Sequence, residues 1–233
     1  MRISDSSAAA PEQVPEQVFA TVTGLARSGD PAAQLALGQM LLNGIGTAPA
    51  PAAALQWFLA SAARGVPMAC NMVGRCCELG WGVPPSPADA MQWYERAARA
   101  GLDWGMYNYA TGLALGWTAP PDLARALEWF RRAASLGHCK SFNIIGGFYE
   151  DGWAVPRDPR RARACYARAA RGGDFRGCFN LGRFLLREGR QEDAMRYFAI
   201  ARATGTPNFV ANMDAFLACP GGQGAPAGAG LTA

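Results

Sequence analysis

The sequence predicts an all-α protein, an α-α superhelix (solenoid) built from five helix-turn-helix repeats. Three observations predict this fold. Glycines recur at a period of 36 residues, each period contains two helical stretches, and neither stretch can bury its apolar face alone. Stacking the repeats against each other buries those faces. The composition agrees, because 46 of the 233 residues are alanine and small side chains allow helices to pack closely.

Three columns of small residues define the repeat. The first ends the second helix of each repeat, where we expect a left-handed cap. The second lies inside the first helix, where glycine is less favourable than alanine by about 1 kcal/mol and therefore indicates close helix contact. The third ends the first helix and turns the chain. The columns are Gly29, Gly65, Gly101, Gly137 and Gly173; Gly38, Gly74, Ala110, Gly146 and Gly182; and Gly44, Gly80, Gly116 and Gly152.

The second helix of each repeat begins after a turn that contains proline. Three of the four residues in the capping column are good N-caps, and proline often takes the first helical position. An aromatic pair and an alanine pair then follow one helical turn apart, so they share a face. We expect both pairs in the core. The capping column is Ala50, Ser86, Asp122 and Asp158, and the aromatic pairs include Trp57-Phe58, Trp93-Tyr94 and Trp129-Phe130.

These columns set the expected domain organisation. The repeat domain covers residues 12–205, with a leading helix over 12–29 and repeats at 30–65, 66–101, 102–137, 138–173 and 174–205. The last repeat is four residues shorter in its turn, where Gly189, Arg190 and Gln191 replace the longer connection. A capping helix is expected over 206–219. Residues 1–11 and the Gly/Ala/Pro-rich residues 220–233 are expected to be disordered.

Composition and charge argue against several functions. No apolar run reaches the roughly 18 to 20 residues of a membrane span, and no secretory signal is visible, so we expect a cytoplasmic protein without membrane contact. The formal net charge is +4, and residues 157–202 hold twelve arginines against five acidic residues. Without a nucleic-acid-binding motif, a solvated basic face is favoured there over a nucleic-acid or acidic partner.

Cysteine and histidine usage disfavours metal and cofactor chemistry. The seven cysteines show no C-x-x-C spacing, so we expect buried, reduced thiols. The adjacent pair Cys76 and Cys77 points to different faces of a helix, which disfavours a metal site. The only histidine, His138, follows a cap glycine and is expected to bond carbonyl groups of the preceding helix. No metal and no cofactor are expected.

The pattern A-x-x-x-L-G, then G-x-G-V, then A-x-x-W-Y-x-x-A-A-x-x-G resembles the Sel-1-like repeat of the tetratricopeptide (TPR) superfamily. The clearest copy runs from Ala69 to Gly101, and the resemblance covers residues 30–205. It implies an adaptor protein, since family members act in signalling, protein quality control, secretion and host contact. A secreted branch pairs two cysteines in each repeat. Here Ala98 and Arg202 occupy the partner positions of Cys70 and Cys178, so that disulfide scheme is not expected.

The resemblance also implies that the first helices line the inner surface of the superhelix. We therefore expect a non-enzymatic scaffold or adaptor, a monomer, that binds a protein or peptide in this concave groove. Amide, cationic and aromatic side chains alternate along the non-core positions, although ordinary solvated positions are an alternative. The expected partner-binding residues are Met68, Asn71, Arg75, Trp104, Tyr107, Lys140, Asn143, Arg176, Phe179 and Arg183.

Two other functions stay open. An inhibitor or immunity-type partner of a toxin or effector would use the same groove. A small-amide hydrolase is the enzymatic alternative, which the single histidine and the missing nucleophile motif disfavour. No catalytic residue is therefore assigned. The tryptophan column of residues 57, 93 and 129 is interpreted as core and not as a ligand cage.

Overall fold

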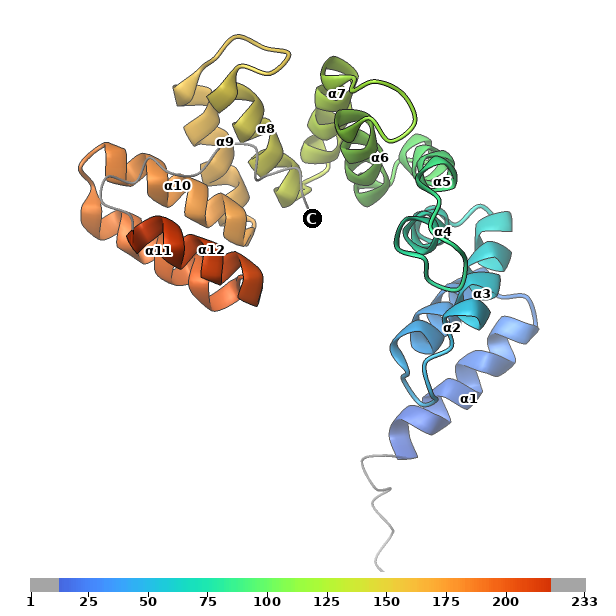
Figure 1. Cartoon of the computed structure of the whole chain (residues 1–233). Helices are drawn as coiled ribbons and strands as arrows, with labels where there is room; N and C mark the ends of the chain where they lie inside the picture. Colours follow the sequence, from blue (N-terminus) through green and yellow to red (C-terminus); the bar gives the residue numbers. More distant parts are fainter. Residues whose placement is uncertain (1–12, 219–233) are drawn as a thin grey trace, which may run out of the picture. The chain divides into compact units, whose positions relative to one another are not determined.

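The computed structural model describes residues 13–218, and within that range the chain forms helices and no β-strand (Figure 1). The segments expected to be disordered, 1–11 and 220–233, lie outside the described residues. The described helices are α1 (Gln13–Arg27), α2 (Pro31–Asn43), α3 (Pro51–Ala63), α4 (Pro67–Leu79), α5 (Pro87–Arg99), α6 (Asp103–Leu115), α7 (Leu123–Ser135), α8 (Cys139–Asp151), α9 (Pro159–Arg171), α10 (Phe175–Arg187), α11 (Gln191–Thr204) and α12 (Pro207–Ala218).

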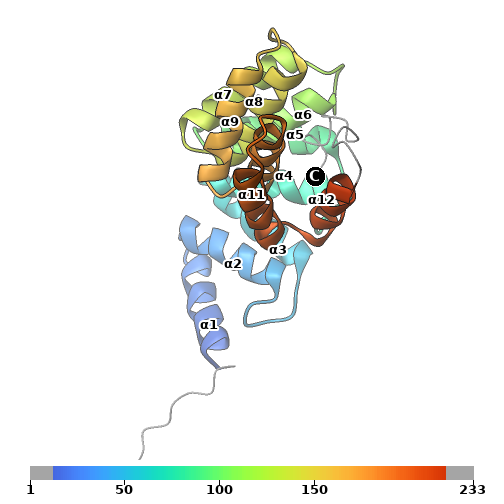
Figure 2. The same cartoon turned by 90° about the vertical axis from the view of Figure 1, so that its left-hand side faces the viewer.

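The helices pack as consecutive hairpins within two compact units. Unit 1 ends at Gly105 and unit 2 begins at Met106, so the boundary falls in the first turn of α6. The closest helix contacts are those of α2 with α3, α4 with α5, α8 with α9, and α10 with α11. In unit 1, α1 lies against α2, and in unit 2, α7, α8 and α9 lie side by side (Figure 2). Each of these tight pairs holds the two helices of one predicted repeat.

Three of the predicted cap residues are confirmed: side-chain oxygens of Ser86, Asp122 and Asp158 accept hydrogen bonds from the first turns of the helices that follow them. Asp30 and Asp174, which the sequence analysis did not single out, cap α2 and α10 in the same way. Ala50, the weak member of its column, makes no such bond. At the other end of α4, Gly80 adopts φ 73°, and its N–H donates to the carbonyl of Cys76. A side chain would be strained in that left-handed conformation, which explains the glycine.

Inside each hairpin, the second glycine column brings two helices unusually close. A Cβ atom added at Gly74 would lie 2.6 Å from Cε1 of Tyr94, and one at Gly146 would lie 2.5 Å from Cε1 of Tyr166. Gly38 and Gly182 meet Phe58 and Phe198 in the same way. Real Cβ contacts are not that short, so the aromatic ring occupies the space that an alanine methyl would need. The predicted close approach is confirmed at these positions.

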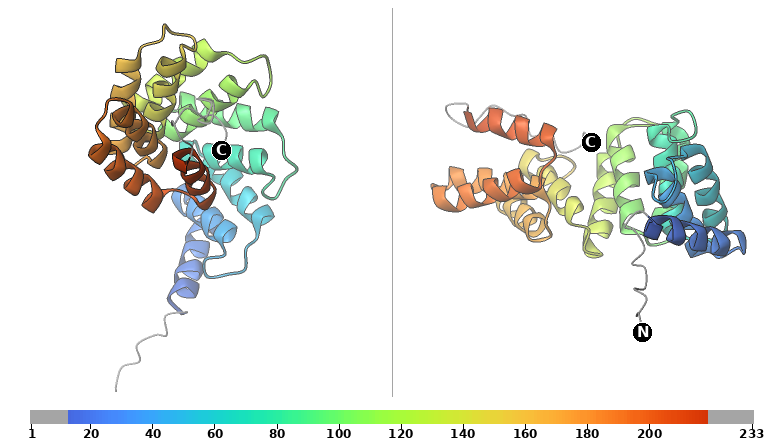
Figure 3. Two further views of the ribbon diagram at one scale, coloured as in Figure 1. Left: turned by 60° about the vertical axis from the view of Figure 1, so that its left-hand side comes forward. Right: turned by 90° about the horizontal axis from the view of Figure 1, so that it is seen from below.

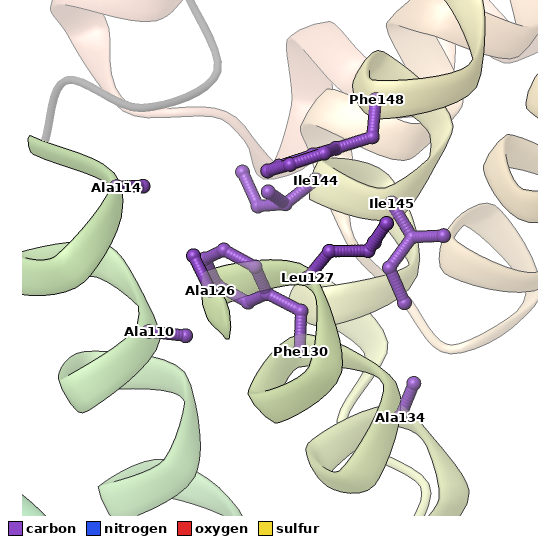
Figure 4. Close-up of a cluster of buried hydrophobic side chains, with 9 residues drawn as sticks. All are labelled: Ala110, Ala114, Ala126, Leu127, Phe130, Ala134, Ile144, Ile145 and Phe148. Carbon is purple, nitrogen blue, oxygen red and sulfur yellow. The ribbon is translucent and has the colours of Figure 1, made fainter. Parts of the chain in front are cut away.

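The core of unit 2 shows how three helices share one cluster. The rings of Phe130 and Phe148 meet edge to face with centroids 6.2 Å apart, and Ala110 points toward the cluster from α6 (Figure 4). The turn after α8 adds Trp153 and Val155 to the same cluster. The cluster consists of Ala110, Ala114, Ala126, Leu127, Phe130, Ala134, Ile144, Ile145 and Phe148.

The two members of each aromatic pair have different environments. The second members, such as Phe58, Tyr94 and Phe130, are fully buried. Trp93 and Trp129 stay half-buried, and the guanidinium carbons of Arg96 and Arg132 lie 4.4 and 4.5 Å from their ring centroids. The tryptophans were expected in the core, but only one face of each helix can contact the neighbouring helix. They therefore lie at the edge of the core, under arginine side chains.

We expect Gly146→Ala to destabilise the protein by about 1–3 kcal/mol, because the new methyl group would overlap the ring of Tyr166. Gly24→Ala in α1 is the matched control, since a Cβ there would meet nothing within 4 Å. That control should raise the free energy of unfolding by up to about 1 kcal/mol. Urea unfolding followed by circular dichroism measures both. Equal effects of the two substitutions would contradict the close packing.

Candidate protein-binding surface

The expected partner-binding residues all lie on first helices of the repeats. In unit 1 they are Met68, Asn71 and Arg75 of α4, with Trp104 at the start of α6. In unit 2 they are Tyr107 of α6, Lys140 and Asn143 of α8, and Arg176, Phe179 and Arg183 of α10. The two sets belong to different units, so the surface is built separately from each.

In unit 1 the accessible groups are a cation and an indole. Arg75 is exposed, and its guanidinium carbon lies 4.9 Å from the ring centroid of Trp81, in the turn after α4. Trp104 is 38% exposed. Met68 is half-buried, whereas Asn71 is 4% exposed and belongs to the interior. Arg75 and Trp104 are therefore the residues of this set that a partner could contact most directly.

In unit 2 a chain of hydrogen bonds joins α8, α9 and α10 around the buried carboxylate of Glu150. Its Oε1 accepts from Arg183 Nη2 at 3.2 Å and from Arg187 Nη1 at 3.4 Å, and its Oε2 accepts from the Tyr166 hydroxyl at 2.7 Å. Arg183 Nη1 also donates to Asn180 Oδ1, and Asn180 Nδ2 donates to Asn143 Oδ1. We call these six residues the polar ladder: Asn143, Glu150, Tyr166, Asn180, Arg183 and Arg187.

The polar ladder changes what two of the expected binding residues do. Asn143 is buried and accepts from Asn180, and the Arg183 side chain is only 8% exposed and pairs with Glu150. A guanidinium held by an internal carboxylate is already engaged in a charge-assisted bond. Arg187, by contrast, leaves 53% of its side chain exposed while it reaches the same carboxylate. The ladder thus presents Arg187 at the surface and keeps Arg183 inside.

Glu150 was not among the expected residues, yet the sequence contains a signal for it. Glu150 precedes Tyr166 by 16 residues, and Glu78 precedes Tyr94 by the same number; in both pairs the tyrosine hydroxyl donates to the carboxylate. Where the ring is phenylalanine, the position 16 residues earlier is apolar, as in Leu42 before Phe58 and Ala114 before Phe130. In these four repeats, a glutamate stands in this column only where the ring 16 residues later is a tyrosine, whose hydroxyl can bind the carboxylate.

Burial shifts the ionisation of these groups. It raises the pKa of the Tyr166 hydroxyl, and the nearby Glu150 carboxylate raises that pKa further. The same two causes raise the pKa of Tyr94 beside Glu78. Both hydroxyls therefore remain protonated donors at neutral pH, which keeps each carboxylate hydrogen-bonded.

Two cationic side chains flank the N-terminal ends of α8 and α10. Burial raises the pKa of Asp174, the N-cap of α10, while the Gly177 N–H bond and the charges of Arg176 and Lys140 lower it. Both cations are thus close enough to act on that carboxylate. They occupy equivalent positions in successive repeats, 36 residues apart. This pair and Arg187 give the first helices of unit 2 a cationic, hydrogen-bonding surface.

The aromatic members of the set contribute to packing. The ring centroids of Phe179 lie 5.8 Å from Phe198, 5.7 Å from Phe209 and 5.3 Å from Phe216. These contacts hold α12 beside the hairpin of α10 and α11 (Figure 1, Figure 3). The ring of Tyr107 lies 4.8 Å from that of His138. Phe179 therefore anchors the last helix while staying half-buried.

The histidine is paired inside the protein. His138 Nδ1 lies 2.9 Å from Ser141 Oγ, and the backbone N–H of His138 donates to the Ala133 carbonyl. Ser141 lies three residues after His138, and the sequence motifs did not indicate that the two side chains pair. His138 is 5% exposed and Ser141 is fully buried. A substrate therefore has no access to the pair as it stands in this structure.

The remaining reactive groups are buried or dispersed. Cys70, Cys76, Cys77, Cys139, Cys165 and Cys178 are free thiols, and burial, with Cys77 adjacent, raises the pKa of Cys76 to about 11. Across residues 13–218, no three histidine, cysteine, aspartate or glutamate side chains gather as metal ligands. In the same part of the chain, no helix has the length and apolar character that a bilayer crossing needs.

Comparison with known proteins supports a repeat fold. The sequence matches the model of a family described as Sel1 repeat at residues 31–66, 67–102, 103–138 and 145–174. Residues 175–205, expected to complete the fifth repeat, lie outside these matches but form the hairpin of α10 and α11. No curated protein sequence matches the chain.

Solved structures give the same fold. A Sel1 repeat protein from Oxalobacter formigenes is 27% identical, with a TM-score of 0.77 over 82% of this chain and 80% of that one. A protective antigen of uropathogenic Escherichia coli with an SLR fold is 23% identical, with a TM-score of 0.70 over 86% and 44%. An immunity protein from Pseudomonas aeruginosa is 17% identical, with a TM-score of 0.53 over 91% and 72%. The predicted all-α solenoid is confirmed.

We expect Arg183→Met to destabilise the protein by about 3–5 kcal/mol, because the buried Glu150 carboxylate keeps the Tyr166 hydroxyl but loses its buried cation and is left with only the half-exposed Arg187. The double variant Glu150→Gln with Arg183→Met should lose markedly less stability than the sum of the two single variants. Arg187→Met is the control and should cost at most about 1 kcal/mol. Urea unfolding measures all four, and strictly additive losses would show that the pair is not coupled.

Proposed function

Because the chain belongs to the Sel1 repeat family, we propose that it is a non-catalytic scaffold that binds a protein or peptide on the first helices of its repeats. The observation that carries the proposal is the surface of α8 and α10 in unit 2. There Lys140, Arg176 and Arg187 present cationic groups on neighbouring helices, beside the amides of Asn143 and Asn180. Such groups suit the carboxylates and backbone carbonyls of a polypeptide.

The surface of the polar ladder is organised before a partner arrives. The internal hydrogen bonds of Glu150 fix Arg183 and limit the freedom of Arg187. A side chain that is already ordered loses less entropy on binding, which favours affinity. In unit 1, exposed Trp104 and Arg75 are residue types that often dominate binding energy at protein interfaces. A polypeptide partner fits these dispersed groups better than a small molecule, which needs an enclosed site.

The proposal assigns the binding role to accessible members of the predicted set. Met68, Arg75, Trp104, Tyr107, Lys140, Arg176 and Phe179 are exposed or half-buried. The buried members Asn71, Asn143 and Arg183 support those residues from within. The protein is proposed to act as a monomer, without nucleic acid as a partner. One similar structure is that of an immunity protein, but at 17% identity the likeness shows the fold alone. A toxin or effector is the alternative class of partner.

We expect the double variant Lys140→Glu with Arg176→Glu to reduce partner capture at least about tenfold, since two attractive charges become repulsive. Tagged wild type and variants are incubated with lysate of the native host, and bound proteins are quantified by mass spectrometry. Trp104→Ala tests unit 1 in the same assay.

Arg171→Glu with Arg196→Glu is the matched control, because these exposed arginines lie on the second helices α9 and α11. It should retain the proteins that the first double variant loses. Circular dichroism melting checks that each variant is folded. Equal capture by wild type, both double variants and Trp104→Ala would refute binding on the first helices.

A further inference from the structure

A cavity of about 680 Å³ opens among α9, α10 and α11 of unit 2. Its floor is apolar and is formed by Leu181, Phe184 and Leu185 of α10 with Tyr197 of α11. Its rim is charged, with Arg160 and Arg163 of α9, Glu188 and Arg190 of the turn after α10, and Asp193 of α11. None of these residues belongs to the surface proposed above, so the cavity is a separate feature of the molecule.

The equivalent place in the preceding repeat is filled by the chain itself. Ile145 and Phe148 stand 36 residues before Leu181 and Phe184, and the turn after α8 packs Trp153 and Val155 against their cluster. The Trp153 ring centroid lies 5.8 Å from that of Phe148. An aromatic and an aliphatic side chain from the turn thus cover the apolar residues of that repeat.

The same turn packs on the preceding repeat in unit 1. A Cβ atom added at Gly82 would lie 2.6 Å from the Cα atom of Ala52, in the first turn of α3. The turn after a first helix therefore covers the start of the second helix of the repeat before it. This contact explains why positions 52 and 82 both carry a small residue, Ala52 and Gly82.

The fifth repeat lacks this cover because its turn is four residues shorter. Gly189 stands 36 residues after Trp153, and α11 already begins at Gln191. The shorter turn supplies no aromatic side chain to pack on Phe184, which is 8% exposed and whose ring centroid lies 5.6 Å from that of Tyr166. As a result, the start of α9, at Pro159 and Arg160, lines an open cavity.

We propose that this cavity binds a loop or peptide of a partner protein that carries an aromatic side chain next to a carboxylate. The aromatic ring packs on Phe184 as Trp153 packs on Phe148. The carboxylate pairs with Arg160, which is exposed and has no ion-pair partner among residues 13–218. Arg163 pairs with Glu188 at 3.5 Å. Arg190 pairs with Asp193 in the same way, so Arg160 leaves the rim with one excess positive charge, which favours an acidic segment.

We propose a partner protein as the source of the occupant. The terminal segments 1–12 and 219–233 contain no phenylalanine, tyrosine or tryptophan, so neither can supply the ring. A second copy of the chain would have to withdraw a turn from its own core, where Trp153 is already packed. A partner protein is therefore the occupant that the apolar floor and the unpaired arginine favour together.

The first test uses a fluorescein-labelled peptide, Glu-Asp-Gly-Trp-Ala-Val, which copies residues 150–155. Fluorescence anisotropy should show saturable binding to the full chain. Replacing tryptophan by alanine in the peptide should weaken binding at least about tenfold, as should Arg160→Glu in the protein. Arg171→Glu, on the same helix but away from the cavity, should leave binding unchanged. No binding by the wild type, or equal binding of both peptides, overturns the proposal.

The second test fills the cavity from within. Glu188 to Arg190 are replaced by the sequence of residues 152–158, Gly-Trp-Ala-Val-Pro-Arg-Asp, which restores the full length of the turn. Peptide binding should be abolished, and the melting temperature should rise by about 3 °C as the floor becomes covered. A second graft with glycine in place of tryptophan should retain binding. Unchanged binding by the first graft, or a wild-type dimer in sedimentation that this graft dissociates, contradicts a partner protein as occupant.

Discussion

The contact between a first-helix glycine and a second-helix aromatic ring sets the geometry of four hairpins in this protein. Because the glycine has no side chain, the ring lies directly against the backbone of the first helix. That position decides where a tyrosine hydroxyl points. In α5 and α9 the hydroxyl reaches a glutamate near the end of the first helix, at Glu78 and Glu150. In unit 2 the close approach of the two helices therefore places the tyrosine hydroxyl against a buried carboxylate, that of Glu150.

That buried carboxylate organises the surface of unit 2. Glu150 draws Arg183 and Arg187 toward α8, and Arg183 also lies 5.8 Å from the ring of Phe216 in α12. Removing ions from water is costly, so such a pair adds little net stability and acts mainly by favouring one arrangement. We infer that the ladder aligns α8, α10 and α12 with each other. The accessible cations of this surface then keep a defined spacing.

The helical repeats could be predicted because their signals are local. A cap residue, a turn glycine or a buried alanine acts within a few residues, and the period of 36 repeats each signal. The candidate binding residues were harder to predict, because their burial depends on residues in other columns of the repeat. From their columns, Asn143 and Arg183 were predicted at the surface, but both are buried. The Tyr166 hydroxyl hydrogen-bonds the buried Glu150 carboxylate, and Arg183 pairs with that carboxylate inside the protein. These contacts connect Glu150 with Tyr166, 16 residues later, and with Arg183, 33 residues later.

We expect the two surfaces proposed for unit 2 to recognise a partner in different ways. On the first helices, polar groups already make internal hydrogen bonds, so binding adds contacts to an ordered surface and depends on charge. In the cavity, no side chain of the turn lies over the buried floor of Leu181, Phe184 and Leu185, so a partner would fill the space that Trp153 and Val155 fill in the preceding repeat. α12 closes the other side of this hairpin through Met213 and Phe216. The shortened turn of the last hairpin therefore leaves the start of α9, in the preceding repeat, without the cover that a longer turn gives.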